Sequence, residues 1–333
     1  MMRIALFGAG RIGEVHARNI AANLRCRLAF VVDPDADAAA RLADRYGGRP
    51  VAADTAMAAG QADAFIVASS TNTHAALLNA LAPLGKPILC EKPVSLDFAE
   101  AEACAQRLDA ADARCMMGFH RRYDPGFAEV RRRVQSGEAG RIFQLCIASR
   151  SWAPPPPDYI RQSGGLFRDQ TIHDFDVARF LLGEPIASVY AVGGCMIDER
   201  IGVLGDIDSA MVTLTAASGA LVCICNGRFA AFGYDQRVEV FGTKATYVVG
   251  NVSADTVACG TADGWLSARP KATFAERYRE AYERELDRFV DFAEGDEADI
   301  ATHHDGLAAQ ALAEAALNSL QTRTPVEVFA RAG

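Results

Sequence analysis

The sequence lacks the features that mark a membrane or nucleic-acid-binding protein. No apolar run approaches the roughly 18 residues that a membrane span needs, and the first residues do not have the layout of a secretory signal peptide. Asp and Glu (42) outnumber Lys and Arg (34), and the net charge of −8 disfavours nucleic-acid and anionic-membrane surfaces. We therefore expect a cytoplasmic protein with no membrane and no nucleic-acid partner.

Metal-ligand spacing is also missing. The nine cysteines mostly sit inside apolar segments, and the pair Cys223 and Cys225 lacks the two further ligands that a zinc site requires. The six histidines are scattered, and their one adjacent pair, His303 and His304, falls in an acidic segment that we expect to be exposed. These patterns predict reduced cysteines, packed in the core, and no metal site.

The chain is long enough for more than one domain. Its 333 residues predict about two domains, and a hydrophobic content of 50% supplies ample material for their cores. There is no internal repeat, and the only low-complexity segment is the run of four prolines at 154–157.

The first 120 residues alternate short apolar strands with helical segments. An expected strand at 3–7 leads into a glycine-rich turn and then into an expected helix at 11–22. In this setting the glycines allow a tight turn and close approach of a pyrophosphate, and the helix N-terminus offers N–H groups to the phosphates. The fingerprint consists of Gly8, Gly10 and Gly13, with Arg11 and Ile12 between them.

The second expected strand, 27–32, ends at Asp33, at about the distance from the glycines where dinucleotide-binding folds place a ribose contact. A carboxylate there accepts hydrogen bonds from a 2′-hydroxyl and repels a 2′-phosphate, so NAD is favoured over NADP. Arg41 and Arg45 on the next expected helix leave some capacity for NADP. The alternative role of Asp33 is that of a turn or cap residue before Pro34.

Two more segments follow strands of this domain. The strand at 64–68 enters a polar loop at the edge of the sheet where ligands bind, and we expect four of its residues to contact the cofactor: Ser69, Thr71, Asn72 and His74. A histidine in the first turn of a helix is as often structural. The strand at 86–90 leads into Glu91, Lys92 and Pro93, which places the lysine at the cofactor edge in an extended conformation.

Residues 164–183 read as a glycine turn followed by a helix that stops at Gly183. Asp169 and His173 are four apart, so they share one face if both are helical. A carboxylate beside an imidazole fixes its tautomer, which suits a general acid or base. An isolated pair of this kind more often only decorates a helix start, and Asp176 is a second candidate for orienting His173.

With these residues the sequence resembles the Gfo/Idh/MocA (glucose–fructose oxidoreductase/inositol dehydrogenase) family along nearly its whole length. Within that family, three segments look like inositol 2-dehydrogenases: 121–124, 172–176 and 233–236. The resemblance implies oxidation of myo-inositol to 2-keto-myo-inositol with NAD as the acceptor. The motifs that carry it are Gly8-x-Gly10-x-x-Gly13, Glu91-Lys92-Pro93, Gly118 to Asp124, Gly164-Gly165, and Asp169-x-x-x-His173-Asp174-x-Asp176.

The resemblance also assigns residues. Lys92, Asp169 and His173 map onto the family's catalytic triad, although either Lys92 or His173 can be the group that takes the proton. Four residues join these three in substrate-contacting regions: His120, Arg121, Asp158 and Tyr234. His120 stands where inositol dehydrogenases often carry methionine. The alternatives are a dehydrogenase of another cyclitol or an aldose, and a cofactor-bound regulator without turnover.

We expect an α/β fold with a Rossmann dinucleotide-binding domain at 1–119 and an α+β domain with a large, mostly antiparallel open sheet at 120–333. Its apolar residues fall on both faces of the strands, as in Met211 and Leu214, which suggests that sheets of two subunits pack together. The resemblance likewise implies a dimer or tetramer. Other expected elements are an extended loop at 152–158, helices at 276–294 and 304–322, and a last strand at 325–329.

Overall fold

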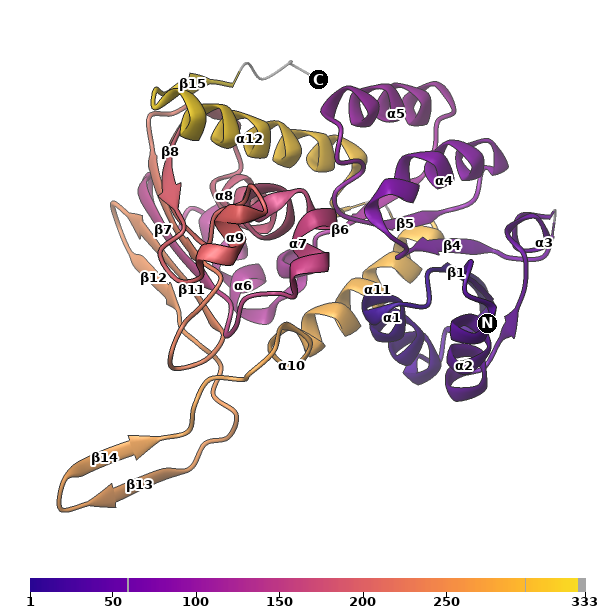
Figure 1. Ribbon diagram of the computed structural model, residues 1–333, viewed down its shortest axis with the longest axis horizontal. Helices are drawn as coiled ribbons and strands as arrows, with labels where there is room; N and C mark the ends of the chain where they lie inside the picture. Colours follow the sequence, from indigo (N-terminus) through magenta and orange to yellow (C-terminus); the bar gives the residue numbers. More distant parts are fainter. Residues whose placement is uncertain (59, 297, 329–333) are drawn as a thin grey trace. The chain divides into compact units, whose positions relative to one another are not determined.

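The computed structural model describes residues 1–58, 60–296 and 298–328, which form two compact units (Figure 1). Unit 1 comprises Met1–Tyr123 and Glu280–Ala308, and unit 2 comprises Asp124–Arg279 and the described residues from Ala309 on. We expected everything after residue 119 to form one C-terminal domain. Residues 280–308 instead belong to unit 1, because their helix packs into its core.

Unit 1 is built on a six-stranded sheet in the order β3-β2-β1-β4-β5-β6, in which all strands are parallel. The strand order reverses between β1 and β4, and in such sheets ligands bind beyond the carboxyl ends of the strands at this point. The predicted Rossmann architecture is therefore confirmed. The strands are β1 (Met2–Phe7), β2 (Cys26–Val32), β3 (Arg49–Pro50), β4 (Ala64–Val67), β5 (Ile88–Glu91) and β6 (Cys115–Gly118).

Helices flank this sheet. The short 3-10 turns η1 (Thr71–Thr73), η2 (Ala82–Leu84) and η3 (His120–Tyr123) connect several of the elements. The helices of unit 1 are α1 (Arg11–Ala22), α2 (Ala36–Tyr46), α3 (Ala53–Met57), α4 (His74–Leu81), α5 (Phe98–Ala110) and most of α11 (Arg279–Ala293).

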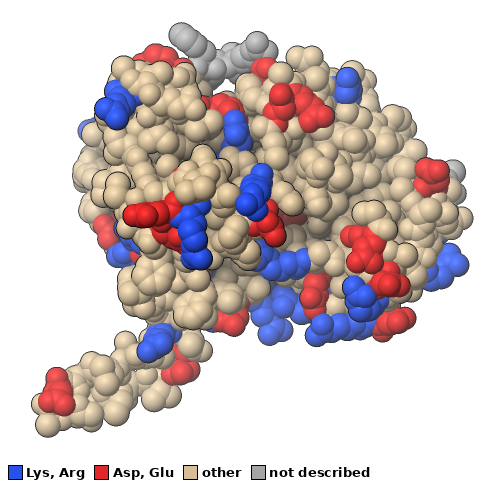
Figure 2. Space-filling model, in the orientation of Figure 1, with Lys and Arg blue, Asp and Glu red and all other residues tan. Residues whose placement is uncertain are grey.

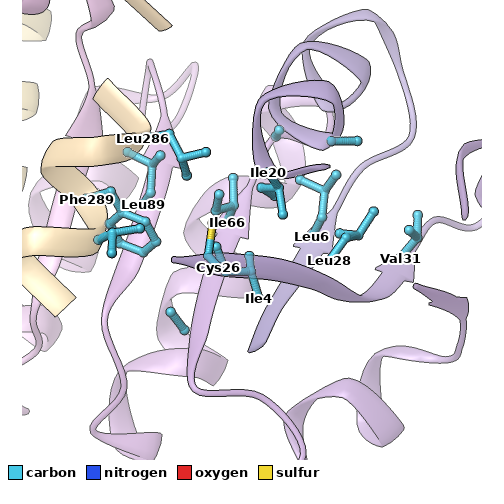
Figure 3. Close-up of a cluster of buried hydrophobic side chains, with 14 of the residues drawn as sticks. Ile4, Leu6, Ile20, Cys26, Leu28, Val31, Ile66, Leu89, Leu286 and Phe289 are labelled. Carbon is cyan, nitrogen blue, oxygen red and sulfur yellow. The ribbon is translucent and has the colours of Figure 1, made fainter. Parts of the chain in front are cut away.

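The core of unit 1 joins segments from opposite ends of the chain. Ile66 of β4 and Leu89 of β5 are fully buried and belong to the same cluster as Leu286 and Phe289 of α11 (Figure 3). Burial of side chains of this size contributes about 1.5–3 kcal/mol each. The helix therefore closes one wall of the parallel sheet.

Unit 2 is built on a seven-stranded sheet in the order β12-β11-β7-β10-β9-β8-β15. Every neighbouring pair is antiparallel except β10 and β7, so the prediction of a mostly antiparallel sheet is confirmed. The expected last strand is the short β15, and Phe329 lies outside the described residues. The strands are β7 (Ile142–Arg150), β8 (Ile186–Gly194), β9 (Ser209–Ala216), β10 (Leu221–Gly227), β11 (Asp235–Gly242), β12 (Thr246–Val249) and β15 (Val326–Glu327).

Helices cover one face of this sheet: α8 packs against β7 and α6, and Ser319 of α12 accepts a hydrogen bond from the Ala191 N–H of β8 at 2.9 Å. Leu214 points into this buried layer, whereas Met211 on the other face is 60% exposed. The second face is thus apolar but open within one chain. The helices are α6 (Pro125–Gln135), α7 (Pro157–Ser163), α8 (Ile172–Leu182), α9 (Glu199–Val203), α10 (Phe274–Arg277) and α12 (His303–Thr322).

Two segments of unit 2 differ from expectation. The extended loop expected at 152–158 ends early, because Pro157 begins α7, and a proline fits the first turn of a helix, where its missing N–H is not needed. A long exposed hairpin of β13 (Ala258–Thr261) and β14 (Gly264–Ser267) was not anticipated (Figures 1 and 2). Trp265 in this hairpin is 81% exposed.

None of the helices described here is long and apolar enough to cross a membrane.

Candidate active site

The structure requires glycine at two of the three fingerprint positions of unit 1, Gly8 and Gly13. Gly8 has φ +110°, and a Cβ there would lie 2.5 Å from the Ala68 carbonyl oxygen. A Cβ on Gly13 would lie 2.1 Å from the carbonyl oxygen of Gly8, so only glycine lets helix and turn approach this closely. A Cβ on Gly10 would meet nothing within 4 Å, which leaves open space beside the turn.

The start of α1 is suited to bind an anion. Gly10 is the N-cap residue and has no side chain to bond the first N–H groups of this 12-residue helix. The N–H groups at Arg11 and Ile12 therefore add to the positive end of the helix dipole, beside the open space at Gly10. This arrangement fits the pyrophosphate of a dinucleotide.

Asp33, which directly follows β2, is held by the backbone. Its Oδ2 accepts a hydrogen bond from the N–H of Ala9 at 2.7 Å, and its Oδ1 accepts one from the N–H of Asp35 at 2.9 Å. These bonds fix the carboxylate against the glycine turn. Each carboxylate oxygen can accept further bonds, so the position fits a ribose contact.

The loop after β4 is organised by its own hydroxyl groups. Ser69 Oγ and Thr73 Oγ1 lie 2.6 Å apart, and Thr73 Oγ1 also donates to the carbonyl oxygen of Ser70 at 2.7 Å. Thr71 is half-buried and Asn72 is exposed on the η1 turn. Both therefore lie at the carboxyl edge of the sheet, where we expected cofactor contacts.

His74 ties this loop to the segment that carries the predicted catalytic lysine. Its Nδ1 lies 2.8 Å from the carbonyl oxygen of Pro93 and its Nε2 lies 3.0 Å from that of Ser69. Burial lowers the pKa of His74, and the two carbonyl oxygens oppose this shift. Both ring nitrogens face backbone oxygens, so a polar contact of this ring with a cofactor would have to replace one of these bonds.

Glu91 and Lys92 leave the sheet at the end of β5. Glu91 is buried, with its Oε1 2.8 Å from Nε2 of His16, and Lys92 next to it is half-buried. The segment is thus fixed on one side by His16 and on the other, through Pro93, by His74.

His120 and Arg121 lie on η3 and are both buried. The His120 ring stacks on Tyr282 of α11, with ring centroids 4.3 Å apart and planes inclined by 15°. The residue that replaces the usual methionine is therefore packed within unit 1 against its returning helix.

In unit 2, Asp169 and His173 do not belong to one regular helix. Asp169 lies on a π-helical turn, η4 (Phe167–Thr171), and His173 lies in the first turn of α8. We expected a single α-helix with the two side chains four residues apart on one face. The wider π-turn changes the angle between them, and π-turns are frequent at functional sites.

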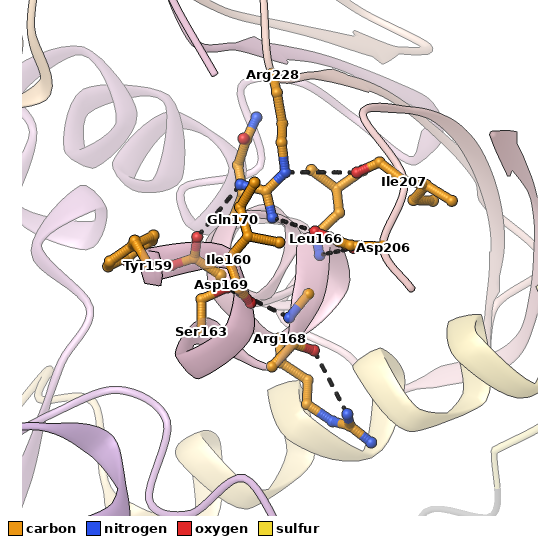
Figure 4. A network of polar contacts seen from close by, with 12 residues as sticks. Tyr159, Ile160, Ser163, Leu166, Arg168, Asp169, Gln170, Asp206, Ile207 and Arg228 are labelled. Atoms are coloured by element: carbon orange, nitrogen blue, oxygen red, sulfur yellow. Dashed lines mark hydrogen bonds and ion pairs between the residues drawn. The ribbon is translucent and has the colours of Figure 1, made fainter. Parts of the chain in front are cut away.

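A polar network fixes Asp169 (Figure 4). The Tyr159 hydroxyl donates to Asp169 Oδ1 at 2.8 Å, and Arg228 Nη1 lies 3.6 Å from Asp169 Oδ2. Arg228 is 2% exposed and also binds Asp206, with Nη2 2.7 Å from Oδ2. One buried guanidinium thus holds two carboxylates.

The second carboxylate of this network holds the glycine turn. Asp206 Oδ1 accepts a hydrogen bond from the N–H of Leu166 at 2.9 Å (Figure 4). Gly165 before it has φ +87°. Arg228 therefore connects Asp169 to the backbone that leads into the π-turn.

The helix that carries His173 is anchored to the sheet. Its neighbour Asp174 is fully buried and accepts a hydrogen bond from Asn226 Nδ2 at 2.8 Å, and Thr171 Oγ1 donates to Asn226 Oδ1 at 2.7 Å. Asp176 is also fully buried, while His173 itself is half-buried.

The remaining two predicted substrate residues differ in exposure. Tyr234 is half-buried and lies edge-on to Tyr278, with centroids 6.3 Å apart. Asp158 lies in the first turn of α7, where its exposed side chain pairs with Arg161 at 2.7 Å. A hollow lined by the four prolines and α9 contains none of the predicted catalytic residues.

The structure adds residues that we did not predict: His16, Tyr159, Arg228 and Glu285. A sequence signal existed for His16, because it shares the helical spacing of the apolar residues Ile12, Val15 and Ile20. The other three carry no motif and are brought into place by the tertiary fold alone.

The prediction that both His303 and His304 are exposed is wrong for His303. We expected the pair with His304 to be exposed, but His303 is buried and its Nε2 lies 2.7 Å from Asp109 Oδ1, with His304 Nε2 at 3.0 Å from the same oxygen. These distances are those of hydrogen bonds. The carboxylate also lies at the N-terminus of α12, where the helix dipole favours an anion and disfavours a metal cation.

Known proteins resemble this chain over both units. Residues 2–119 match a profile described as an oxidoreductase family with an NAD-binding Rossmann fold, and residues 127–248 match the GFO/IDH/MocA C-terminal domain. An inositol 2-dehydrogenase of Rhizobium meliloti (strain 1021) is 42% identical over 327 residues, covering 98% of this chain and 99% of that protein.

Solved structures of inositol dehydrogenases also match this chain over nearly its whole length. A myo-inositol dehydrogenase from Corynebacterium glutamicum ATCC 13032 matches with a TM-score of 0.95 and 41% identity over 99% of both chains. A scyllo-inositol dehydrogenase from Lactobacillus casei, solved with bound NAD(H) and scyllo-inositol, matches with a TM-score of 0.91 and 25% identity over 98% of this chain and 99% of that one. The likeness spans the full length of these proteins.

Proposed function

Because the chain belongs to the Gfo/Idh/MocA family of NAD-binding oxidoreductases, we propose that it oxidises myo-inositol to 2-keto-myo-inositol with NAD as the hydride acceptor. The observation that carries this proposal is the full-length match to inositol dehydrogenases. All three residues of the proposed catalytic triad, Lys92, Asp169 and His173, are present, which favours an enzyme over a regulator without turnover.

NAD would be held in unit 1. The open space at Gly10 and the first N–H groups of α1 would bind its pyrophosphate, and Asp33 would accept hydrogen bonds from the adenosine ribose. Ser69, Thr71, Asn72 and Glu91 flank the same edge of the sheet. The negative charge of Asp33 disfavours a 2′-phosphate, so NAD is preferred to NADP.

The bound cofactor supplies the redox chemistry by accepting a hydride from the carbinol carbon. His173 takes the proton of the reacting hydroxyl, and Asp169 orients the imidazole. The ammonium of Lys92 donates a hydrogen bond to the same oxygen and stabilises the negative charge that develops on it. The fixed positions of Asp169 and of the Glu91-Lys92 segment support these roles.

The substrate is a neutral ring of hydroxyl groups, and His120, Arg121, Asp158 and Tyr234 are proposed to read them. Arginine and tyrosine are suited to this because they present donors in fixed directions. The stacking of His120 on Tyr282 limits how far that ring can move toward a substrate.

The test is an assay of purified protein with NAD and myo-inositol, followed by NADH absorbance. Growth of absorbance supports the proposal. No turnover with myo-, scyllo- and chiro-inositol, combined with turnover of an aldose, would assign the chain to another dehydrogenase of this family. No NADH from any polyol or sugar, despite NAD binding, would indicate the regulator.

A second copy of the chain is the proposed macromolecular partner. The open face of the unit 2 sheet carries Phe143, Met211 and Leu221, each exposed and apolar, and packing against another copy would bury them. Light scattering should show a dimer or tetramer. None of the nine cysteines, all within the described residues, forms a disulfide, which is compatible with the proposed location in the cytoplasm.

A further inference from the structure

A buried cluster of three ionisable groups includes Glu91, the residue that precedes Lys92. It consists of His16 on α1, Glu91 at the end of β5 and Glu285 on α11. One ligand atom of each lies within 4.8 Å of the others, and all three side chains are buried. The cluster is thus assembled from three elements of unit 1 that are far apart in the sequence.

Glu285 is the least expected member. It is fully buried, and neither of its carboxyl oxygens has a hydrogen-bond partner within the described part of the chain. An ionised carboxylate in such a place is very costly, so the group is expected to keep its proton. Burial raises the pKa of Glu285 well above its ordinary value, and the charge of Glu91 raises it further.

Within the described part of the chain, no lysine or arginine forms a hydrogen bond with the Glu285 carboxyl. His16 and Glu91 face it, and Leu286 and Phe289 next to it on α11 are packed into the apolar core (Figure 3). Arg25 pairs with Asp291 and Glu294 at the exposed end of the same helix. The other titratable groups on α11 are Arg279, Glu280, Tyr282, Glu283, Arg284, Asp287, Arg288 and Asp291. Arg284 pairs with Glu280, and Arg288 pairs with Asp291 and Asp296. Cys26, His120 and Tyr123 lie on elements packed against the helix.

The geometry argues against a metal ion in the cluster. Nε2 of His16 and Oε1 of Glu91 are 2.8 Å apart, which is the distance of a hydrogen bond. Two ligands of a tetrahedral zinc ion at about 2.0–2.1 Å each would lie roughly 3.3 Å apart. His16 and Glu91 are therefore bonded to each other.

We propose that Glu285 is a neutral carboxylic acid that, together with His16, positions Glu91 and so fixes the segment that carries Lys92. A neutral Glu285 keeps a second carboxylate charge away from Glu91, because the two carboxyl groups bring an oxygen within 4.8 Å of each other. Ionisation of Glu285 would put two carboxylates side by side in the core and would displace Glu91. Glu285 acts through Glu91 and touches neither substrate nor cofactor.

The first test uses stability and needs no substrate. A carboxyl group that keeps its proton in the folded chain, but loses it in the unfolded chain above about pH 4.3, makes stability fall as pH rises. Relative to Glu285→Gln, the wild-type unfolding constant should rise about tenfold per pH unit between pH 5 and 7. Parallel stability curves for the two proteins would overturn the neutral-acid assignment.

The second test uses kinetics and rests on the proposed function. Glu285→Gln keeps a neutral polar side chain of the same size beside Glu91, so we expect kcat within about threefold of wild type. Glu285→Leu removes the polar group and should lower kcat at least tenfold with little change in KM for NAD. Equal kcat for wild type and the leucine variant, or equal loss in both variants, would overturn the positioning role. Glu280→Gln, an exposed change on the same helix, is the control.

The outcomes are separable. If the wild type does not turn over myo-inositol, the proposed function fails, while the stability comparison still decides the charge of Glu285. If Glu285→Leu does not fold, the glutamine variant and the wild type suffice for that decision. Metal analysis of purified protein that found one equivalent of zinc, lost in Glu285→Gln, would replace the acid with a metal site.

Discussion

The predicted catalytic residues of the two units are held in opposite ways. In unit 1, the segment of Lys92 is fixed by the contact of the Pro93 carbonyl oxygen with His74 Nδ1 and by the buried contact of His16 with Glu91. In unit 2, Asp169 is fixed by a buried guanidinium, Arg228, that it shares with Asp206. The first support is a buried histidine–carboxylate contact without a guanidinium, and the second is one guanidinium shared by two carboxylates.

The two supports should respond differently to substitution. Replacing His74 in unit 1 removes packing and its hydrogen bond with the Pro93 carbonyl oxygen, whereas replacing Arg228 in unit 2 leaves Asp169 and Asp206 without their counter-charge. The predictions below begin with the residues that the two supports hold, turn to Arg228, and end with Asp33 and Asp63, which lie outside both supports.

The largest effects on turnover are expected when Lys92 or His173 is replaced. Lys92→Ala and His173→Ala should each lower kcat by about 10²–10⁴-fold, because each removes a group that we propose acts on the reacting proton or oxygen. Both variants should still melt cooperatively and bind NAD. Lys86→Ala, at an exposed lysine near the start of β5, is the control. Near-normal turnover in either variant would reject the role of that residue.

The next prediction concerns the stability that Arg228 contributes to unit 2. Arg228→Met should lower the free energy of unfolding by about 3–5 kcal/mol, because it breaks a buried ion pair and strands Asp169 and Asp206. Urea unfolding measures the loss. Arg200→Met, at an arginine that is 82% exposed, should leave the unfolding midpoint unchanged. A small effect of the Arg228 change would show that the network is not structural.

A smaller effect concerns the cofactor. Asp33→Ser removes the charge that repels a 2′-phosphate, and a charge–charge contact of this kind is worth about 1–4 kcal/mol. The ratio of kcat/KM for NADP over NAD should rise accordingly. Asp37→Ser, an exposed change in the first turn of α2, serves as the control. An unchanged ratio would show that other groups decide the preference.

The smallest effect on stability is expected at the exposed ion pair of Arg3 and Asp63. The hydrogen bond from Arg3 lowers the pKa of Asp63 to about 2, so its stabilisation is present above the unfolded value of 3.8 and is lost as pH falls toward 2. Both side chains are more than a third exposed, so Asp63→Asn should shift Tm by no more than about 2 °C at pH 7. The shift should vanish near pH 2. A larger shift at pH 7, or one that persists at pH 2, would contradict this.

The regular parts of the fold could be predicted from local sequence. The glycine fingerprint between a strand and a helix located β1, α1 and Asp33, and apolar alternation located β9 and β10. Such patterns are local because a strand or helix imposes a period on the residues it buries.

The missed parts depend on distant contacts. The periodicity of α11 predicted a helix, but nothing in residues 280–293 tells which sheet that helix will cover, so it was assigned to the wrong domain. The π-turn around Asp169 is fixed by Arg228 and Asp206, which come later in the chain. A pattern of four-residue spacing could not reveal it.

The candidate site divides in the same way. Motifs named Lys92, Asp169 and His173, but they did not name the residues that hold them, because Arg228 and Glu285 are single charged residues in otherwise ordinary segments. Their burial distinguishes them from other charged residues, and burial is known only once the chain is folded.

The late position of α11 in the chain has a consequence for synthesis. All six strands of the nucleotide sheet leave the ribosome long before the helix that contributes Leu286 and Phe289 to their core. The face of the nascent sheet that α11 covers therefore stays exposed while residues 124–279 of unit 2 are being translated. A fragment cut after residue 119 would keep that face open permanently, so a transplanted nucleotide-binding module needs the returning helix to travel with it.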